Sequence, residues 1–182
     1  MTHEIIMAGF GGQGVMLIGQ LLTYAGMIDG KHVSWIPSYG PEMRGGTANC
    51  AVIVSDEPVG SPLVSEPSAV IAMNLPSLDK FEPSLQPGGV LIINKSLINR
   101  TARRTDIKAY DVAANDVAAA LGNTKVANMV ALGALVAATN VVSVTSINKA
   151  FTKMFAKRPE LFEINAKAIR SGMESVLGKP QV

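Results

Sequence analysis

The chain has 182 residues, of which 48% are hydrophobic, so it is long enough for one domain with a full core and too short for two. Its formal net charge of +2 argues against a nucleic-acid-binding protein, which needs a much more basic face. The single cysteine, Cys50, excludes an internal disulfide and any zinc site or iron–sulfur cluster held by several thiolates of this chain.

The first residues, Met1 to Glu4, lack the basic flank and apolar stretch of a secretory signal, so we expect a cytoplasmic protein. The longest nearly all-apolar stretch, residues 126–138, has 13 residues, whereas a membrane-spanning helix needs about 20. We therefore expect a buried helix there and no membrane partner.

The chain opens with an apolar run at residues 4–8 that predicts a strand, and four glycines follow within residues 9–14. Apolar residues at helical spacing then predict a helix to about Met27, with Gly30 placed to end it. Further short apolar runs bounded by turn residues predict strands at 32–36, 47–55, 68–74, 88–95 and 106–113. Residues 75–87 have room for only a short helix broken by prolines.

Helical patterns dominate the rest of the chain, at 111–121, 126–139, 146–156 and 159–177. The last helix has Pro159 in its first turn and closes at Gly178. Strands intermixed with helices, followed by helices that pack back, predict a single α/β domain over residues 1–182. We expect a Rossmann-like three-layer α/β/α sandwich around a mostly parallel sheet. The connection at 37–46 is too short for a crossover helix, which leaves room for one or two antiparallel strands.

The glycine turn satisfies the spacing G-x-G-x-x-G with Gly9, Gly11 and Gly14, after a strand and before a helix. A dinucleotide site also needs an acidic residue at the end of the second strand, where this chain has Ile-Pro-Ser, and the nearest acid, Asp29, precedes that strand. Three interpretations stay open: an NAD or FAD site, a purely structural turn, and a site for a phosphate-bearing ligand or a partner chain.

The second distinctive segment is the proline- and glycine-rich "PSYGPEMRGG" at residues 37–46. With "GFGGQG" before it and "TANCAVIVS", "GSPLV" and "NMVALGAL" after it, the chain resembles the gamma-type subunit, or the equivalent domain, of the 2-oxoacid:ferredoxin (acceptor) oxidoreductases. That family includes the pyruvate, 2-oxoglutarate and 2-ketoisovalerate oxidoreductases.

The resemblance implies a multi-subunit enzyme that oxidatively decarboxylates a 2-oxoacid on thiamine diphosphate, with 2-oxoglutarate or a branched-chain 2-oxoacid favoured. Electrons would pass through iron–sulfur clusters to ferredoxin or a similar acceptor, and coenzyme A would take the acyl group. This chain has no G-D-G thiamine segment and one cysteine, so we expect no catalytic or metal-binding residue on it and no cofactor bound by it alone. Thiamine diphosphate, magnesium and the clusters would lie on partner subunits, in an assembly that could be a dimer of hetero-oligomers.

The resemblance also implies which residues form a binding site for coenzyme A or a partner. These are Gly9, Gly11, Gly12, Gln13, Gly14, Tyr39, Gly40, Glu42, Arg44, Gly45 and Gly46. Both loops would lie at the carboxyl edge of the sheet, facing one another. The Arg44 guanidinium suits a phosphate or carboxylate, or else pairs with Glu42 or a neighbouring subunit. Tyr39 would stack on a ring or brace the loop.

Other residues have plainer interpretations. Cys50 lies in an apolar strand and is expected to pack as a small hydrophobe, and Trp35 and the methionines are assigned to the core. A basic run could attract coenzyme A or an acidic ferredoxin, or form a merely solvated face. It consists of Lys95, Arg100, Arg103, Arg104 and Lys108.

Two alternative functions remain at this point. A stand-alone dinucleotide-dependent oxidoreductase would require tight NAD or FAD binding and a catalytic acid or base near the turn. A non-enzymatic ligand-binding module would purify without thiamine-binding or cluster-binding partners.

Overall fold

The computed structural model describes residues 1–39 and 47–178. Within them, six strands form one sheet in the order β2-β3-β1-β4-β5-β6. The strands are β1 (Thr2–Phe10), β2 (His32–Tyr39), β3 (Thr47–Ser55), β4 (Ala69–Ala72), β5 (Val90–Asn94) and β6 (Lys108–Val112).

One strand of the sheet, β3, runs against the others. It pairs antiparallel with both β1 and β2, whereas β1, β4, β5 and β6 pair parallel. Strands β2 and β1 flank β3 and both run antiparallel to it. They are therefore parallel to each other, and their carboxyl ends lie at the same edge of the sheet. The prediction of a mostly parallel sheet with one or two antiparallel strands is confirmed.

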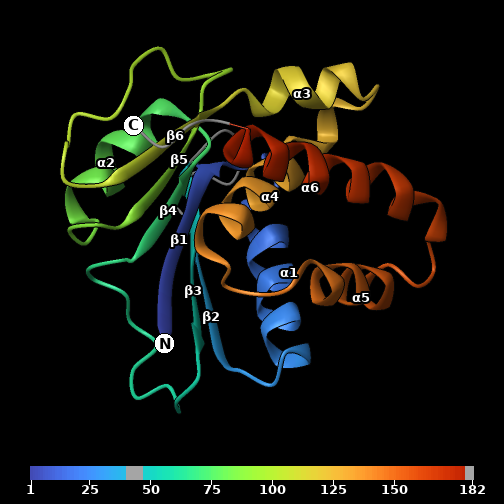
Figure 1. The fold of residues 1–182 in the computed structure, drawn as a ribbon, viewed down its shortest axis with the longest axis horizontal. Coiled ribbons are helices and arrows are strands. Elements are labelled where there is room, and N and C mark those ends of the chain that lie inside the picture. Colours follow the sequence, from blue (N-terminus) through green and yellow to red (C-terminus); the bar gives the residue numbers. More distant parts are fainter. Residues whose placement is uncertain (40–46, 179–182) are drawn as a thin grey trace.

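Helices cover both faces of the sheet unequally (Figure 1). One face carries α1 (Val15–Ile28), α3 (Ala114–Ala120), α4 (Ala127–Thr139), α5 (Val144–Met154) and α6 (Phe162–Leu177). The other carries α2 (Leu75–Phe81) and a 3-10 turn at Glu82–Ser84. Two further 3-10 turns, Thr124–Val126 and Pro159–Leu161, precede α4 and α6. The predicted three-layer α/β sandwich is therefore confirmed.

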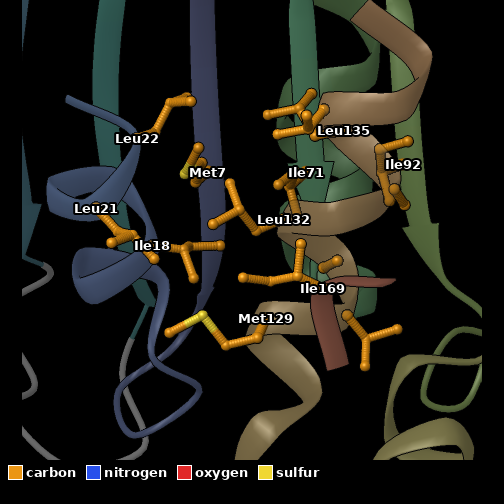
Figure 2. Packing of buried hydrophobic residues seen from close by; sticks show 14 of the residues in the cluster. Met7, Ile18, Leu21, Leu22, Ile71, Ile92, Met129, Leu132, Leu135 and Ile169 are labelled. Atoms are coloured by element: carbon orange, nitrogen blue, oxygen red, sulfur yellow. The ribbon is translucent and has the colours of Figure 1, made fainter. Parts of the chain in front are cut away.

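The core follows the two-residue alternation of the strands. In β1, Ile5 and Met7 face the layer of five helices, and Ile6 and Ala8 face α2. Figure 2 shows the larger cluster, in which strand residues meet side chains of α1, α4 and α6. Helix α4 is buried on nearly all sides, which agrees with the apolar run predicted to be a buried helix. Within the described residues, no helix combines the length and the apolar character that a membrane crossing requires.

Several predicted boundaries were wrong. The helix predicted from residue 111 begins at Ala114, because Asp111 and Val112 pair with β5 as part of β6. Strand β2 extends to Tyr39 instead of ending at residue 36, since Pro37 is tolerated where a strand pairs on one side only.

Two other boundaries moved by a turn or less. Helix α5 starts two residues earlier than predicted, because the Ser143 hydroxyl caps it by accepting from the Ser146 amide at 3.1 Å. Residues Pro159–Leu161 form a 3-10 turn ahead of α6. The assignment of every methionine to the core was also wrong, since Met1 and Met27 are exposed. Trp35, on the edge strand, is partly buried and packs against the larger core cluster.

Candidate functional site

The glycine turn connects the end of β1 to the first turn of α1. The Gln13 amide donates to the Phe10 carbonyl at 3.1 Å, which closes the turn. Gly12 and Gly14 have φ angles of 93° and 75°, a left-handed region that favours glycine. Gly11 and Gly12 are exposed, and the space beside Gly12, where a side chain would start, is open. The outer side of the turn is therefore accessible backbone.

The Gln13 side chain stabilises the turn through hydrogen bonds to Phe10 and to the residues that follow β4. Its Oε1 accepts from the Phe10 amide at 2.6 Å and from Asn74 Nδ2 at 3.3 Å, and its Nε2 donates to the Met73 carbonyl at 3.4 Å. A Cβ on Gly9 would lie 2.6 Å from Gln13 Oε1, so this glycine leaves room for the amide. Gly9 and Gln13 thus tie the turn to the end of β4.

Gly14 is fixed by a residue far along the chain. Asn128, buried in the first turn of α4, donates from Nδ2 to the Gly14 carbonyl at 3.2 Å. A Cβ on Gly14 would collide with that same amide nitrogen. The glycine at this position is required both by its φ angle and by the close approach of α4.

A cleft of about 420 Å³ opens beside the turn, within the size range of ligand pockets. Its lining residues are Phe10, Gly11, Gly12, Gly14, Val15, Met16, Leu17, Tyr39, Thr47 and Ala48. The turn, the carboxyl end of β2 and the first residues of antiparallel β3 thus meet around one space. Tyr39 is 66% exposed there, and Thr47 opposes Phe10 in the sheet.

The N-terminus of α1 forms part of this cleft. No side chain caps it, and its first turn carries no acidic residue. The first amides of a helix have no carbonyl partner within the helix and point outward with a partial positive charge. An anionic group in the cleft would therefore meet unpaired donors of α1, and the apolar side chains around them would contact uncharged parts of a ligand.

Asp29, the acid nearest to the second strand, is engaged elsewhere. Its carboxylate accepts from the Ser143 amide at 2.8 Å, from the Ser143 hydroxyl at 3.1 Å and from the Ser146 hydroxyl at 2.5 Å. Burial raises the pKa of Asp29, but these hydrogen bonds outweigh burial and hold the pKa below its ordinary value. Asp29 joins the end of α1 to the start of α5, at the opposite end of α1 from the cleft. This arrangement disfavours the dinucleotide interpretation.

The basic run at residues 95–108 is largely neutralised. Arg100 binds Asp79 at 2.6 Å and Glu82 at 2.8 Å, and Arg104 binds Asp106 at 2.6 Å. Glu82 is 3% exposed and also accepts from the backbone amides of Arg103 and Arg104. Burial raises the pKa of Glu82, but the hydrogen bonds from these amides and from Arg100 bring it below its ordinary value. This cluster anchors the segment after β5 to the 3-10 turn at Glu82–Ser84.

Cys50 is fully buried against α1, and its Sγ lies 3.5 Å from the Val15 carbonyl. Burial raises the pKa of the thiol to about 12, and the neighbouring Trp35 indole lowers it only in part. The cysteine therefore packs as predicted. Among the described residues, no three His, Cys, Asp or Glu side chains gather in a group that could hold a metal ion.

The structure thus brings Tyr39 to the same cleft as Gly11, Gly12 and Gly14, whereas Gly9 and Gln13 support the turn without lining the cleft. The other predicted site residues, Gly40, Glu42, Arg44, Gly45 and Gly46, lie outside the described residues. Sequence reasoning missed Thr47 and the apolar lining of the cleft, as well as the supporting amides of Asn74 and Asn128. A lone asparagine in the apolar run at 126–138 was the available signal, because a buried amide needs a partner.

A family model described as pyruvate ferredoxin/flavodoxin oxidoreductase matches residues 4–175. The chain is 35% identical to the 2-oxoglutarate synthase subunit KorC of Methanocaldococcus jannaschii, over 96% of this chain and 94% of that protein. It is 36% identical to the ketoisovalerate oxidoreductase subunit VorA of Methanothermobacter thermautotrophicus over 94% of this chain. The match covers 36% of that subunit, so the chain spans about a third of its length.

Solved structures share the fold. The gamma subunit of a keto/oxoacid ferredoxin oxidoreductase from Geobacter sulfurreducens matches with a TM-score of 0.82 and 34% identity, over 97% of this chain and 99% of that one. A 2-oxoglutarate:ferredoxin oxidoreductase from Magnetococcus marinus, solved with 2-oxoglutarate, coenzyme A and succinyl-CoA bound, matches in fold alone. Its TM-score is 0.91 and its identity 22%, over 100% of this chain and 32% of that one. The chain therefore belongs to the pyruvate ferredoxin/flavodoxin oxidoreductase family, as the order of its motifs predicted.

Proposed function

We propose that this chain is a gamma-type subunit, forming one domain, of a multi-subunit 2-oxoacid:ferredoxin oxidoreductase that converts a 2-oxoacid into its acyl-CoA. The observation that carries the proposal is the nearly end-to-end match to KorC, which extends over 94% of that subunit. Relatives are named for 2-oxoglutarate and for ketoisovalerate, so we propose one of these two substrate types.

The chemistry itself belongs to partner subunits in this proposal. Thiamine diphosphate with magnesium would activate the 2-oxoacid on one partner, and iron–sulfur clusters would carry the electrons to a ferredoxin-type acceptor. One cysteine cannot supply the several thiolates that such a cluster takes. The present chain would contribute binding and assembly, without activity of its own.

We further propose that the cleft at the glycine turn takes part of coenzyme A. The open backbone of Gly12 and the uncapped N-terminus of α1 suit a phosphate, and the apolar lining suits the uncharged part of the molecule. Tyr39 stands at the mouth with an exposed ring. Arg44, which follows it by five residues in the sequence, would add a bidentate contact to a phosphate.

The assembly part of the proposal is tested by purification. A tagged chain expressed with the neighbouring genes of its own genome should retain iron, thiamine diphosphate and turnover of a 2-oxoacid with viologen as acceptor. The chain purified alone should hold neither cofactor and show no turnover. Stoichiometric iron in the isolated chain, or no thiamine-binding partner in the purified material, would overturn the proposal.

The coenzyme A site is tested by two matched glycine variants. Gly12 and Gly30 both have positive φ angles and open space beside them, at opposite ends of α1, so Gly12→Ala and Gly30→Ala carry similar backbone strain. In the assembled enzyme, Gly12→Ala should raise the Michaelis constant for coenzyme A about tenfold, as expected for the loss of roughly 1.4 kcal/mol of binding free energy. Gly30→Ala should leave it unchanged. Equal effects of the two variants on the Michaelis constant for coenzyme A would contradict a coenzyme A site at the glycine turn.

Arg44→Ala separates the two roles proposed for the second loop. A raised Michaelis constant with an intact complex assigns Arg44 to coenzyme A, by roughly tenfold to a hundredfold for a charge-assisted contact. Dissociation on gel filtration assigns it to a subunit interface. If the assembly and the Michaelis constant for coenzyme A are both unchanged, Arg44 takes part in neither role.

A further inference from the structure

Helix α5 presents a basic face that no acidic side chain of its own segment balances. Residues 144–158 contain three lysines and one arginine, and neither aspartate nor glutamate. Lys149 and Lys153 are four residues apart, so they lie on the same face of α5, and both are exposed. Lys157 and Arg158 follow in the turn after the helix, and Arg158 pairs with Glu160 at 3.0 Å.

These lysines lack the ion pairs that neutralise most of the basic run at residues 95–108. Lys149, Lys153 and Lys157 form no salt bridge within residues 1–39 and 47–178, whereas Arg100 and Arg104 are paired with acidic side chains. Like charges at this spacing repel each other and weaken a helix slightly. Lysines without a salt bridge therefore gather on and just after α5, whereas Lys108 and Lys125, which also form none within the described residues, stand singly on other elements.

The basic face borders an aromatic groove between α5 and the start of α6. A cleft of about 430 Å³ is lined by Lys149, Lys153 and Phe162, with threonine and asparagine side chains between them. A second cleft of about 390 Å³ shares Thr152 and Phe162 with the first and continues to Phe155. The two clefts thus adjoin along the outer side of α5.

Stacked aromatic rings form the base of this groove. The Phe151 and Phe155 rings stack with their centroids 4.6 Å apart, and the Phe162 ring lies 6.3 Å from Phe151. Phe162 is 37% exposed, so part of an aromatic face remains open beside the lysines. An apolar base beside a positive rim is the arrangement of a protein interface, where aromatic contacts anchor and charges orient.

The groove is held in place independently of the glycine-turn cleft. Asp29 and the Ser143 cap fix the first turn of α5 to the end of α1, which is the far end of α1 from that cleft. The cleft and the groove share no lining residue. A ligand of the groove would therefore leave the coenzyme A site unobstructed.

We propose that the α5–α6 groove, defined by Lys149, Thr152, Lys153, Phe155 and Phe162, docks an acidic segment of a partner protein. Carboxylates of the segment pair with Lys149 and Lys153, and one apolar side chain packs against Phe162. The chain's low net charge and the aromatic base favour a protein over a nucleic acid. Because lysine ammonium groups form the polar side of the groove, the association rate of an acidic partner should depend on salt. This proposal does not rest on the proposed enzymatic function.

The probe is a displayed library of short random peptides, selected on the immobilised full chain. A parallel selection uses Lys149→Glu/Lys153→Glu, and the matched control is Lys108→Glu/Lys125→Glu, which changes the net charge equally at exposed lysines elsewhere. Circular dichroism verifies that each variant is folded. Fluorescence anisotropy then gives the dissociation constant of the enriched peptides at about 50 mM and about 300 mM salt.

The proposal expects enriched peptides that are acidic and contain an aromatic or aliphatic residue. Their affinity should fall about tenfold for the α5 variant and at the higher salt, and stay within about twofold for the control. Phe162→Ala should also weaken the peptides while leaving the chain folded. Absence of enrichment, peptides without acidic character, or equal binding to the α5 variant and the control overturns the proposal. The proposal is also overturned if the chain binds duplex DNA more tightly than any peptide. It is likewise overturned if the chain self-associates in sedimentation and the α5 variant abolishes this association.

Discussion

The side-chain amide of Asn128 donates to the carbonyl of Gly14 at 3.2 Å, although 114 residues separate the two. Gly14 is the residue before α1, and Asn128 lies in the first turn of α4. The hydrogen bond holds the start of α1 against the central buried helix. The geometry of the glycine turn therefore depends on a residue from the other half of the chain.

Gly14→Ala should reduce the free energy of unfolding by roughly 2 to 4 kcal/mol, because a left-handed φ is costly for alanine and the new methyl group displaces the Asn128 amide. Gly30 has the same φ of 75°, but the space beside it is open. Gly30→Ala should therefore reduce the free energy of unfolding by only about 1 kcal/mol. Urea denaturation compares the two variants, and equal costs would contradict a role for Asn128. The double variant Gly14→Ala/Asn128→Ala should cost less than the sum of the single variants.

Asp29→Ala should cost about 1 to 2 kcal/mol at pH near 7, since the carboxylate joins α1 to the capped start of α5. The pKa of Asp29 is below its ordinary value, so its carboxylate stabilises the fold at pH values above the pKa of the unfolded chain. This stabilisation is lost as the pH falls through the pKa of the folded chain. The difference between the urea midpoints of wild type and variant should therefore shrink toward pH 3. Glu174→Ala, at an exposed position on α6, is the control. A difference independent of pH would argue against this role of the charge.

Glu82→Gln should destabilise the chain by roughly 2 to 4 kcal/mol, because it removes a buried carboxylate that accepts from Arg100 and from two backbone amides. Because the pKa of Glu82 is lowered in the folded chain, its carboxylate contributes fully to stability at pH values above the pKa of the unfolded chain. This contribution is lost as the pH falls through the pKa of the folded chain. Thermal unfolding of both proteins from neutral to acidic pH measures the effect. Asp106→Asn, which alters an exposed pair with Arg104, should cost much less. Comparable losses would contradict the buried role of Glu82.

The Cys50 thiol should resist alkylation in the folded chain. With a pKa of about 12 and complete burial, the reactive thiolate is scarce and inaccessible. Iodoacetamide at mildly alkaline pH should label the protein only when it unfolds, so the labelling rate should rise with urea in parallel with the loss of circular dichroism. Rapid stoichiometric labelling without denaturant would show that the strand around Cys50 opens locally.

Much of the fold could be predicted because its signals are local. Alternating and apolar runs located all six strands, and the short link after residue 36 correctly allowed an antiparallel neighbour. Errors arose where two patterns overlap, as at Asp111, which suits a strand end and a helix start equally well. Pro37 predicts an end of β2 that the structure does not have, because sequence alone does not distinguish an edge strand, where proline is tolerated, from an inner one.

The candidate site was predictable only in part. Glycine spacing located the turn, and the carboxyl-edge rule placed Tyr39 beside it. The distant partners of Gln13, Gly14 and Asp29 could not be found this way, since these contacts join segments at least 60 residues apart in the chain. The basic run at 95–108 was ambiguous for the same reason, because Asp79 and Glu82 reach Arg100 only through tertiary packing.

Helix α1 is held at one end by Asn128 and at the other by Ser143 and Ser146, and all three residues leave the ribosome well after the helix itself. A nascent chain that has exposed only its first strands therefore lacks both attachments of α1. Its glycine turn gains the hydrogen bond from Asn128 only once the start of α4 has been translated. Premature termination before α4 should consequently leave Gly14 without this support, even though every residue of the turn has been made.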